Sequence, residues 1–385
     1  MNESKRVEII RLIVVVGFAS SVIFHYVAGM YHGHGYPYST FLFMPNDKFN
    51  DFFNIYRASL HLNPYAESVS VYFPFMYMPV YLFTFIKPYP AYLIYFGLFL
   101  SFLIAAAVKY LPSENMPNRL LSFFSLFIIS YPTLFTCDRG NLECFVFMSL
   151  GMFIYCYNSG RFSVAALFLA GAIAMKLYPA VFVVLFLADR RWKPVFLTAI
   201  FTAILSVASS ALLSGGIWAS LAGVQKNLLA FKIQYINSNH GLQHSSSLYV
   251  PIKLLAERLG GVDAIPAGYP ILAIIVFLIV AAHVIFREKE FWKKVAILSI
   301  MMILLPQVSY DYKLIHVFLP LLLYLGTESR SRFDRFYSVA FGLLLIPKDY
   351  YYLHSDISIN GIINSMIMLA FIASIFAERC NKEPA

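Results

Sequence analysis

The sequence contains few charged residues. Lys, Arg, Asp and Glu together make up 13% of the 385 residues, whereas an ordinary soluble domain has about 25%. Hydrophobic residues account for 60% of the chain and aromatic residues for 17%, and a water-soluble fold cannot bury that much apolar surface. This composition excludes a soluble globular protein and predicts a chain that folds in a lipid bilayer.

Cysteine is also scarce. The four cysteines, Cys137, Cys144, Cys156 and Cys380, form no CxxC pair and no metal-binding spacing, which excludes a disulfide framework and a structural zinc site. The sequence also lacks heptads, low-complexity tracts and a convincing internal repeat. We therefore expect residues 1–385 to form a single membrane domain.

Acidic residues are outnumbered by basic ones, 20 to 29. In a membrane protein Lys and Arg collect in cytoplasmic loops, so we interpret the surplus as topological and expect no nucleic-acid partner. The first apolar run follows Lys5, Arg6 and Arg11. It is long for the core of a signal peptide and no small-residue cleavage site follows it, so we predict an uncleaved first span.

Eleven apolar runs are the candidate membrane spans. Runs of about 17 to 25 apolar residues can cross a hydrocarbon core of about 30 Å as helices, and a helix satisfies its own backbone in lipid. The runs lie near residues 10–30, 90–109, 120–136, 141–157, 163–188, 194–213, 270–286, 295–308, 313–326, 336–347 and 360–377. The predicted fold is all-α, a polytopic integral membrane protein.

Basic clusters between these runs orient them, because such clusters stay in the cytoplasm. The run 163–188 lies between two basic connectors and is interrupted at residues 175–179, so we predict a hairpin of two short helices whose apex faces outward. The run 73–87 would invert every later segment if it crossed the bilayer, so we predict a juxtamembrane or re-entrant helix at the outer surface. The result is about twelve spans in the cell membrane, plasma or inner, with both termini cytoplasmic.

Two long polar connectors then lie outside the membrane, residues 31–72 and residues 214–269. The unusual polar motifs all fall on this outer side. They occupy residues 50–53, 63–65, 138–141, 176–179, 240–247, 309–313 and 348–350. Their shared side predicts a single polar site at the outer boundary of the membrane.

Asp51 and Lys176 are the charged residues in these motifs with the most specific surroundings. Asp51 lies in a stretch whose apolar residues recur at the spacing of an interfacial helix, where a carboxylate can act as a general base or serve as a solvated loop residue or helix cap. Lys176 lies inside an apolar run, where an ammonium normally faces a cavity or a partner. It can bind an anion such as phosphate, or extend its amine to the membrane surface.

The remaining motifs have structural interpretations too. Asp138 and Arg139 can form an ion pair at a helix end, and Asn141 can start a helix. Asp311 and Lys313 can pair in the same way. His240 and His244 can be ordinary loop histidines, since the spacing HxxxH alone is weak evidence for a metal.

Several of these motifs together resemble the GT-C superfamily of membrane glycosyltransferases, and most closely glycosyltransferase family 87, the polyprenyl-phosphate-mannose-dependent α-mannosyltransferases. They run in the family order and share one side of the membrane. The matching residues are Asp51-Phe52 with Tyr56 and Ala58, Asn63-Pro64-Tyr65, Tyr72 with Pro74 and Pro79, Gly140-Asn141, Lys176 with Tyr178-Pro179, and Asp311-Tyr312-Lys313-Leu314. The chain departs from the family where Asp-Arg-Gly-Asn replaces a Gly-Gln-x-Asn pattern and where YFPFMYMP only approximates a Tyr-Pro-Pro stretch.

The resemblance implies a GT-C type fold with outer-face juxtamembrane helices. It also implies a donor sugar on a polyprenyl phosphate, an acceptor linked to a lipid or glycan, and inversion at the anomeric carbon with Asp51 as the base. The residues available to bind the donor phosphate are Arg139, Lys176, His240, His244, Lys313 and Lys348. Those available to bind sugar or acceptor are Tyr56, Asn63, Tyr65, Asp138, Asn141, Tyr178 and Asp311. With phosphate held by side chains no cofactor is required, although Asp51 and Asp138 could hold a divalent metal.

Three other functions fit a polytopic chain. A surface-polysaccharide polymerase or ligase would depend on outer-loop Arg and His residues such as Arg139 and His244 rather than on Asp51. A transporter or flippase for lipid-linked sugars would show repeats and broken helices at the bilayer midplane, and Lys176 does interrupt an apolar run. A purely structural membrane protein would need none of these polar residues.

Overall fold

The computed structural model describes residues 1, 3–32, 48–61, 63–65, 71–111, 116–260, 265–328, 331–353 and 357–380. These residues are mostly helical, with one two-stranded hairpin. The chain divides into two compact units. The first unit comprises Met1–Asn46, Ser101–Asp138 and Asn239–Ala385, and the second comprises Asp47–Leu100 and Arg139–Ser238.

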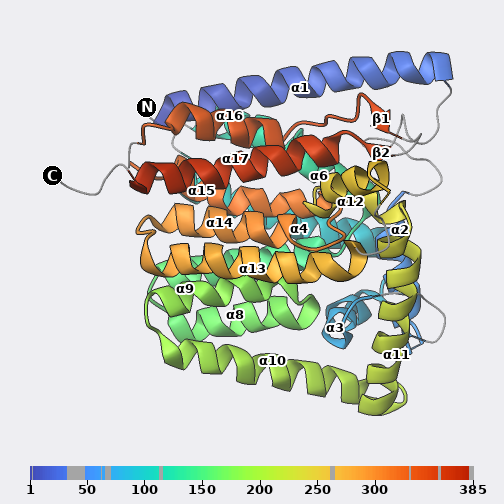
Figure 1. Ribbon diagram of the computed structural model, residues 1–385. Coiled ribbons are helices and arrows are strands. Elements are labelled where there is room, and N and C mark those ends of the chain that lie inside the picture. Colours follow the sequence, from blue (N-terminus) through green and yellow to red (C-terminus); the bar gives the residue numbers. More distant parts are fainter. Residues whose placement is uncertain are drawn as a thin grey trace. The chain divides into compact units, whose positions relative to one another are not determined.

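The first unit is a bundle in which α1, α16, α17, α14 and α13 pack in this order, side by side (Figure 1). Its elements are α1 (Glu3–His32), the end of α4 (Pro88–Tyr110), α5 (Met116–Phe123), η1 (Phe124–Ile128), α6 (Tyr131–Arg139), η4 (His240–Leu242), α12 (Tyr249–Arg258), α13 (Ile265–Phe286), α14 (Phe291–Leu304), η5 (Asp311–Val317), α15 (Phe318–Leu325), α16 (Asp334–Leu344), β1 (Tyr352–Leu353), β2 (Ile357–Ser358) and α17 (Asn360–Cys380). Helix α14 is buried on nearly every side, as expected for a helix that is apolar all round. It forms the core of this unit.

In the second unit, α8 packs between α7 and α10. Alanine and glycine dominate the buried residues of α8, and small side chains let neighbouring helices approach closely. The elements of this unit are α2 (Asn50–Ser59), α3 (Pro74–Phe83), the start of α4, α7 (Glu143–Asn158), α8 (Phe162–Met175), η2 (Tyr178–Phe182), α9 (Val183–Ala188), α10 (Trp192–Leu212), α11 (Gly216–Phe231) and η3 (Lys232–Asn237).

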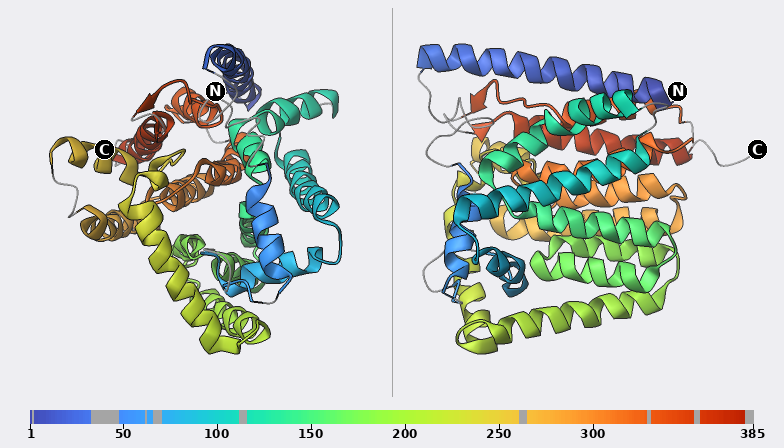
Figure 2. Two further views of the ribbon diagram at one scale, coloured as in Figure 1. Left: turned by 90° about the vertical axis from the view of Figure 1, so that its right-hand side faces the viewer. Right: turned by 180° about the vertical axis from the view of Figure 1, so that it is seen from behind.

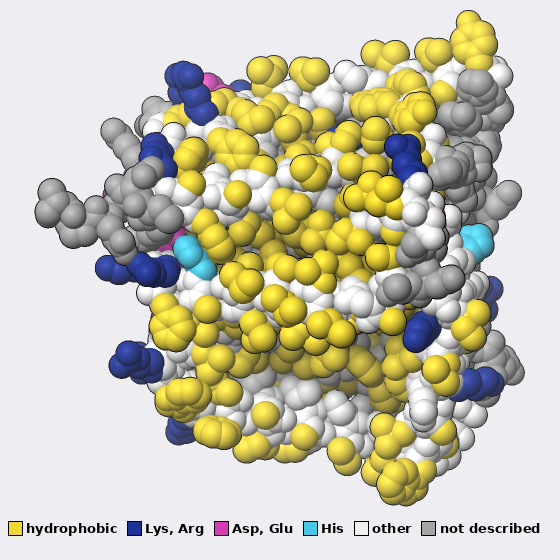
Figure 3. All heavy atoms as spheres, in the orientation of Figure 1, with side chains coloured by type: hydrophobic (Ala, Val, Ile, Leu, Met, Phe, Trp, Pro, Cys, Tyr) yellow, Lys and Arg dark blue, Asp and Glu magenta, His cyan; other side chains and the backbone are white. Residues whose placement is uncertain are grey.

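Five described helices are long and apolar enough to cross a membrane, namely α1, α4, α10, α13 and α17. A sixth candidate is the bent pair formed by residues 117–128 and 131–139, with a bend of 59°. The outward face of α13 is covered with hydrophobic side chains, including Ile271, Ile275 and Ile279 (Figure 3), which lipid would cover. The membrane character and the all-α fold are therefore confirmed, and the number of about twelve spans stays a prediction.

The predicted break in the run 163–188 is confirmed. Helix α8 ends at Met175, and Lys176 adopts extended backbone angles, φ −151° and ψ 139°. The chain then turns back, because the guanidinium of Arg191, just after α9, lies 4.5 Å from the ring centroid of Phe162 at the start of α8. The two short helices therefore form the expected hairpin.

The run 73–87 forms α3, a helix of 10 residues that begins at Pro74. At about 1.5 Å per residue it is only half as long as the hydrocarbon core is thick. Helix α11 follows α10 after a turn at Gly215 and lies across the end of α10 (Figures 1 and 2). The position of α3 at the membrane surface stays a prediction.

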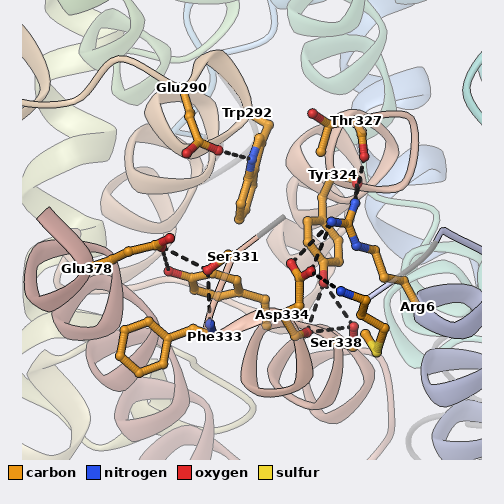
Figure 4. Close-up of polar contacts among 12 residues, drawn as sticks. Arg6, Glu290, Trp292, Tyr324, Thr327, Ser331, Phe333, Asp334, Ser338 and Glu378 are labelled. Carbon is orange, nitrogen blue, oxygen red and sulfur yellow. Dashed lines mark hydrogen bonds and ion pairs between the residues drawn. The ribbon is translucent and has the colours of Figure 1, made fainter. Parts of the chain in front are cut away.

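The described parts of the basic connectors 1–6, 287–294 and 331–335 lie at one end of the bundle of the first unit, near the N label (Figure 1). The buried guanidinium of Arg6 donates to both carboxylate oxygens of Asp334, at 3.2 and 3.1 Å, and to the carbonyl of Thr327 at 2.7 Å (Figure 4). Lys293 pairs with Glu378 at 2.9 Å. This grouping fits the prediction that these connectors share one side of the membrane.

Candidate active site

Asp51 lies in the first turn of α2, and its side chain is half-buried. The helix buries Phe52, Ile55, Tyr56 and Ser59, which recur at the spacing of one helix face. The ring of Phe52 stacks on that of Tyr95 with centroids 5.2 Å apart. Packing of this face holds α2 in place, so Asp51 lies on an anchored helix and is not a solvated loop residue.

Gly140 brings a second segment against the start of α2. Its φ is +65°, and a Cβ at this position would lie 2.9 Å from Cα of Phe49 and 3.1 Å from Cβ of Phe52. Real Cβ atoms do not approach a backbone atom this closely. Gly140 therefore allows the turn between α6 and α7 to touch α2, which places the next residue, Asn141, beside Asp51.

Asn141 uses its whole amide in this contact. Its Nδ2 donates to Oδ2 of Asp51 at 2.6 Å, and its Oδ1 accepts from the backbone N–H of Glu143 at 3.1 Å. Tyr95 donates its hydroxyl to the Asn141 carbonyl at 2.5 Å. Asn141 therefore lies two residues before the first residue of helix α7, close to the helix start that one of its interpretations predicts, and also donates to Asp51.

Glu143, the first residue of α7, is the buried acceptor for the Lys176 motif. Its side chain has no solvent exposure, and its Oε2 accepts from the Lys176 ammonium at 2.6 Å. Tyr178 donates its hydroxyl to Oε1 of the same carboxylate. The ammonium also lies 4.8 Å from the ring centroid of Tyr72. Lys176 is therefore held by a carboxylate and an aromatic ring, and 13% of its side chain remains exposed.

Tyr72 connects the two halves of this arrangement. Burial raises the pKa of its hydroxyl, and the negative charges of Asp51 and Glu143 raise it further, whereas a hydrogen bond with Asn141 lowers it. We call the six residues Asp51, Tyr72, Asn141, Glu143, Lys176 and Tyr178 the Asp51 cluster. All six belong to the second unit.

Four other predicted site residues belong to the same unit. Tyr56 donates its hydroxyl to the carbonyl of Ile86 at 2.7 Å, and Tyr65 donates to the carbonyl of Tyr72 at 3.0 Å, so both hydroxyls join backbone segments. Asn63 is exposed, and Arg139 ends α6 with its side chain half-buried. Their roles in binding sugar or phosphate stay predictions.

A second group of predicted residues lies in the first unit, centred on Asp311. The buried Asp311 carboxylate accepts hydrogen bonds from Tyr131 at 2.8 Å, Ser246 at 2.5 Å and Asn360 at 2.6 Å. Burial, together with the charge of Asp349, raises the pKa of Asp311 to about 6 despite these donors. Asp311 thus joins four segments of the unit.

Two basic residues, His244 and Lys348, lie close to Asp311 and Asp349. Nδ1 of His244 lies 3.7 Å from Oδ1 of Asp349. Lys348 donates to the carbonyls of Leu343 and Ile346 at 2.5 and 2.8 Å, and burial lowers its pKa to about 8. We call these residues the Asp311 cluster: Tyr131, His244, Ser246, Asp311, Lys348, Asp349 and Asn360.

The other predicted residues of the first unit are placed as follows. Asp138 is buried near the end of α6. The Lys313 amine donates to the carbonyl of Val308 at 3.4 Å, and the exposed His240 accepts from Tyr310 at its carbonyl at 3.2 Å. Within each unit the structure thus gathers several predicted residues, and their shared function stays a prediction.

Glu143 is the residue of the Asp51 cluster that the sequence analysis overlooked. The sequence does mark this residue, because Glu143 lies two residues after the Asp-Arg-Gly-Asn motif and is a carboxylate within the apolar run 141–157. An ionisable residue in such a run is a candidate functional residue by default. Among the described residues, no group of three or more His, Cys, Asp or Glu side chains could hold a metal ion.

Comparison with known proteins gives one match. The profile of glycosyltransferase family 87 matches residues 71–306, which is more than half of the chain. No curated protein and no solved structure shows a significant match. The matched range contains Tyr72, Asn141, Glu143, Lys176 and Tyr178, whereas Asp51 and Asp311 lie outside it. The chain is a membrane glycosyltransferase and belongs to glycosyltransferase family 87.

Proposed function

We propose that this protein transfers a hexose, mannose or a similar sugar, from a polyprenyl-phosphate donor to a lipid- or glycan-linked acceptor. Asp51 is the general base, and the transfer inverts the anomeric configuration. The observation that carries the proposal is the pairing of Asp51 with Asn141 at 2.6 Å in the same unit as an ammonium held on a buried carboxylate. One cluster thus holds a base and a cation.

The base half of the reaction follows from the geometry of Asp51. The Asn141 amide occupies Oδ2 and fixes the plane of the carboxylate. In the transfer, the acceptor oxygen attacks the anomeric carbon while Asp51 takes the hydroxyl proton, a role that contributes about 10²–10⁴ in rate. The bond from the anomeric carbon to the phosphate oxygen breaks on the opposite side, which inverts the configuration.

The leaving group needs a cation, because the departing polyprenyl phosphate takes the bonding electrons and gains negative charge. Lys176 is the basic residue of the cluster and is partly exposed, so we assign it to the donor phosphate, with Arg139 as a second donor. Fixed donors at a developing charge act most strongly where water is excluded. Tyr72 and Tyr178 offer hydroxyls and rings to the sugar, and no metal or cofactor is needed.

The proposed site faces the non-cytoplasmic side of a cell membrane. In the second unit, Glu143 and Asn158 are the two ends of α7, so the Asp51 cluster lies at one end of this helix. Tyr157, near the other end, donates to Asp189 at 2.7 Å beside the basic connector 190–193. A basic connector marks the cytoplasmic side, which supports an outward-facing site.

The test is a transfer assay in membranes. Membranes containing the protein are incubated with radiolabelled polyprenyl-phosphate hexoses and candidate lipid acceptors, for the wild type, Asp51→Asn and Asn54→Ala. Asn54 is exposed on the same helix, so its variant controls for the folding of α2. We expect Asp51→Asn to lose a factor on the order of 10²–10⁴ in rate while Asn54→Ala keeps wild-type activity.

Two results would contradict the proposal. A folded Asp51→Asn variant with full transfer activity would exclude the base role. Loss of activity in His244→Ala with retention in Asp51→Asn would instead indicate a polysaccharide polymerase or ligase. Competition among mannosyl, glucosyl and galactosyl donors in the same assay identifies the sugar.

A further inference from the structure

We infer that Glu143 is a positioning residue that holds Lys176 in place for the phosphate of the donor, an inference that rests on the proposed function. Glu143 does not itself touch substrate. Its carboxylate is fully buried, whereas Lys176 keeps 13% of its side-chain surface exposed. In this ion pair the carboxylate of Glu143 is therefore buried, and the side chain of Lys176 is the partly exposed member.

The local backbone explains why Lys176 needs this partner. The residue occupies the extended break between α8 and η2, so no helix fixes its side chain. A carboxylate 2.6 Å away gives the amine a fixed acceptor, and it uses one of the three N–H donors of an ammonium.

Two aromatic residues restrict the amine further. The ring centroid of Tyr72 lies 4.8 Å from Nζ of Lys176, and that of Tyr178 lies 5.9 Å away. Both distances are within the range in which a ring face attracts a cation. Since Tyr178 also donates its hydroxyl to Glu143, the carboxylate orders both the cation and one of its flanking rings.

Glu143 is also linked to the base. Its backbone N–H donates to Oδ1 of Asn141 at 3.1 Å, and Nδ2 of the same amide donates to Asp51. The segment 141–143 thus holds the base through the side chain of Asn141 and the cation through the side chain of Glu143. The spacing between the two reacting groups is set by one short piece of backbone.

This role predicts a particular kinetic signature. If Glu143 positions Lys176 for the donor phosphate, its loss weakens donor binding, while Asp51 keeps its own hydrogen bond to Asn141. We expect Glu143→Gln to raise the KM for the polyprenyl-phosphate sugar by on the order of tenfold or more, as for a lost contact to a charged group. The kcat should fall as well, because the same ammonium meets the negative charge that the phosphate gains as it leaves.

The experiment measures donor KM and kcat for the purified full chain in nanodiscs. The variants are Glu143→Gln, Lys176→Arg, Lys176→Gln and the charge reversal Glu143→Lys with Lys176→Glu. The charge reversal places an ion pair at the same two positions with the signs exchanged, and the unfolding midpoint of every variant is measured to show which of them are folded. We expect Lys176→Arg to retain most of the donor affinity and Lys176→Gln to raise the donor KM as Glu143→Gln does. The charge-reversed variant should not regain donor affinity, since the exposed member of its ion pair is now an anion.

Two outcomes would overturn the inference: an unchanged donor KM in folded Glu143→Gln, or recovery of wild-type transfer in the reversed pair, which would make the ion pair merely structural. The Asp51→Asn variant separates this inference from the base assignment. Full transfer by Asp51→Asn would remove Asp51 from the mechanism and leave the KM effect of Glu143→Gln standing.

Discussion

The side-chain amide of Asn141 donates to Oδ2 of Asp51 at 2.6 Å, although 90 residues separate the two in the sequence. The same amide accepts from the N–H of Glu143, so it cannot rotate without losing a bond. The orientation of the Asp51 carboxylate therefore depends on the turn that begins α7.

Replacing Asn141 with Ala should lower kcat and leave donor KM near its wild-type value. The reason is that Asp51 keeps its place on α2 but loses the bond that orients its carboxylate, and misplacement by about 1 Å can reduce a rate on the order of 10²-fold. Asn158→Ala, an exposed change at the other end of α7, is the control. Steady-state kinetics with varied donor concentration check the split, and an unchanged kcat in Asn141→Ala would show that Asp51 needs no such orientation.

The helices of this fold were predictable, whereas the contacts between distant segments were not. Apolar runs predict helices because lipid requires internally satisfied backbone, and Lys176 marked the break after α8 because a charge in an apolar run needs a special position. The bond between Asp51 and Asn141 leaves no periodic pattern in the sequence. Neither does the bond between Tyr131 and Asp311, which are 180 residues apart.

The sequence also left the roles of aromatic residues open. Tyr56 and Tyr65 are predicted to bind sugar, and their hydroxyls donate to backbone carbonyls at 2.7 and 3.0 Å, so their role in sugar binding stays a prediction. A tyrosine in an interfacial helix gives the same sequence signal in both roles, because its body is apolar and its end is polar. Only the position of the backbone acceptor distinguishes them.

Gly140→Ala should reduce transfer far more than Gly160→Ala. Both glycines have positive φ, +65° and +72°, so both variants lose on the order of 1 kcal/mol from the left-handed conformation. Only at Gly140 would the added Cβ meet the backbone of Phe49, at 2.9 Å; at Gly160 it meets nothing within 4 Å. The clash should displace α2, and with it Asp51.

Thermal unfolding and transfer rates of the two variants measure these effects separately. We expect both variants to have a lower thermal midpoint than the wild type, and Gly140→Ala the lower of the two. The transfer rate should fall on the order of 10²-fold only in Gly140→Ala. Equal rates in the two variants would mean that α2 can shift without moving the base.

Asp334→Ala should destabilise the protein without changing its catalytic constants. The substitution leaves the guanidinium of Arg6, which is 1% exposed, without its counter-charge, and breaking a buried pair from one side costs about 3–5 kcal/mol. Arg335→Ala alters the next residue, which is exposed, and serves as the control. Unfolding monitored in detergent should show a lower midpoint for Asp334→Ala alone, and equal midpoints would indicate that the backbone carbonyls bound by Arg6 suffice.

The free energy of unfolding should decrease as the pH rises from about 4 to about 6, because of Asp311. Burial and the charge of Asp349 raise the pKa of this carboxyl from 3.8 to about 6 in the folded state. Within that window the folded protein keeps a proton that the unfolded chain releases, so the folded state binds more protons and stability decreases as the pH rises. The contribution is fully present below pH 3.8 and lost above about pH 6. The asparagine of Asp311→Asn cannot titrate, so the difference in unfolding midpoint between wild type and variant should shift with pH across this window and level off as the pH rises past about 6. A difference that stays constant from pH 4 to pH 7 would show that Asp311 is ionised throughout, held by Tyr131, Ser246 and Asn360.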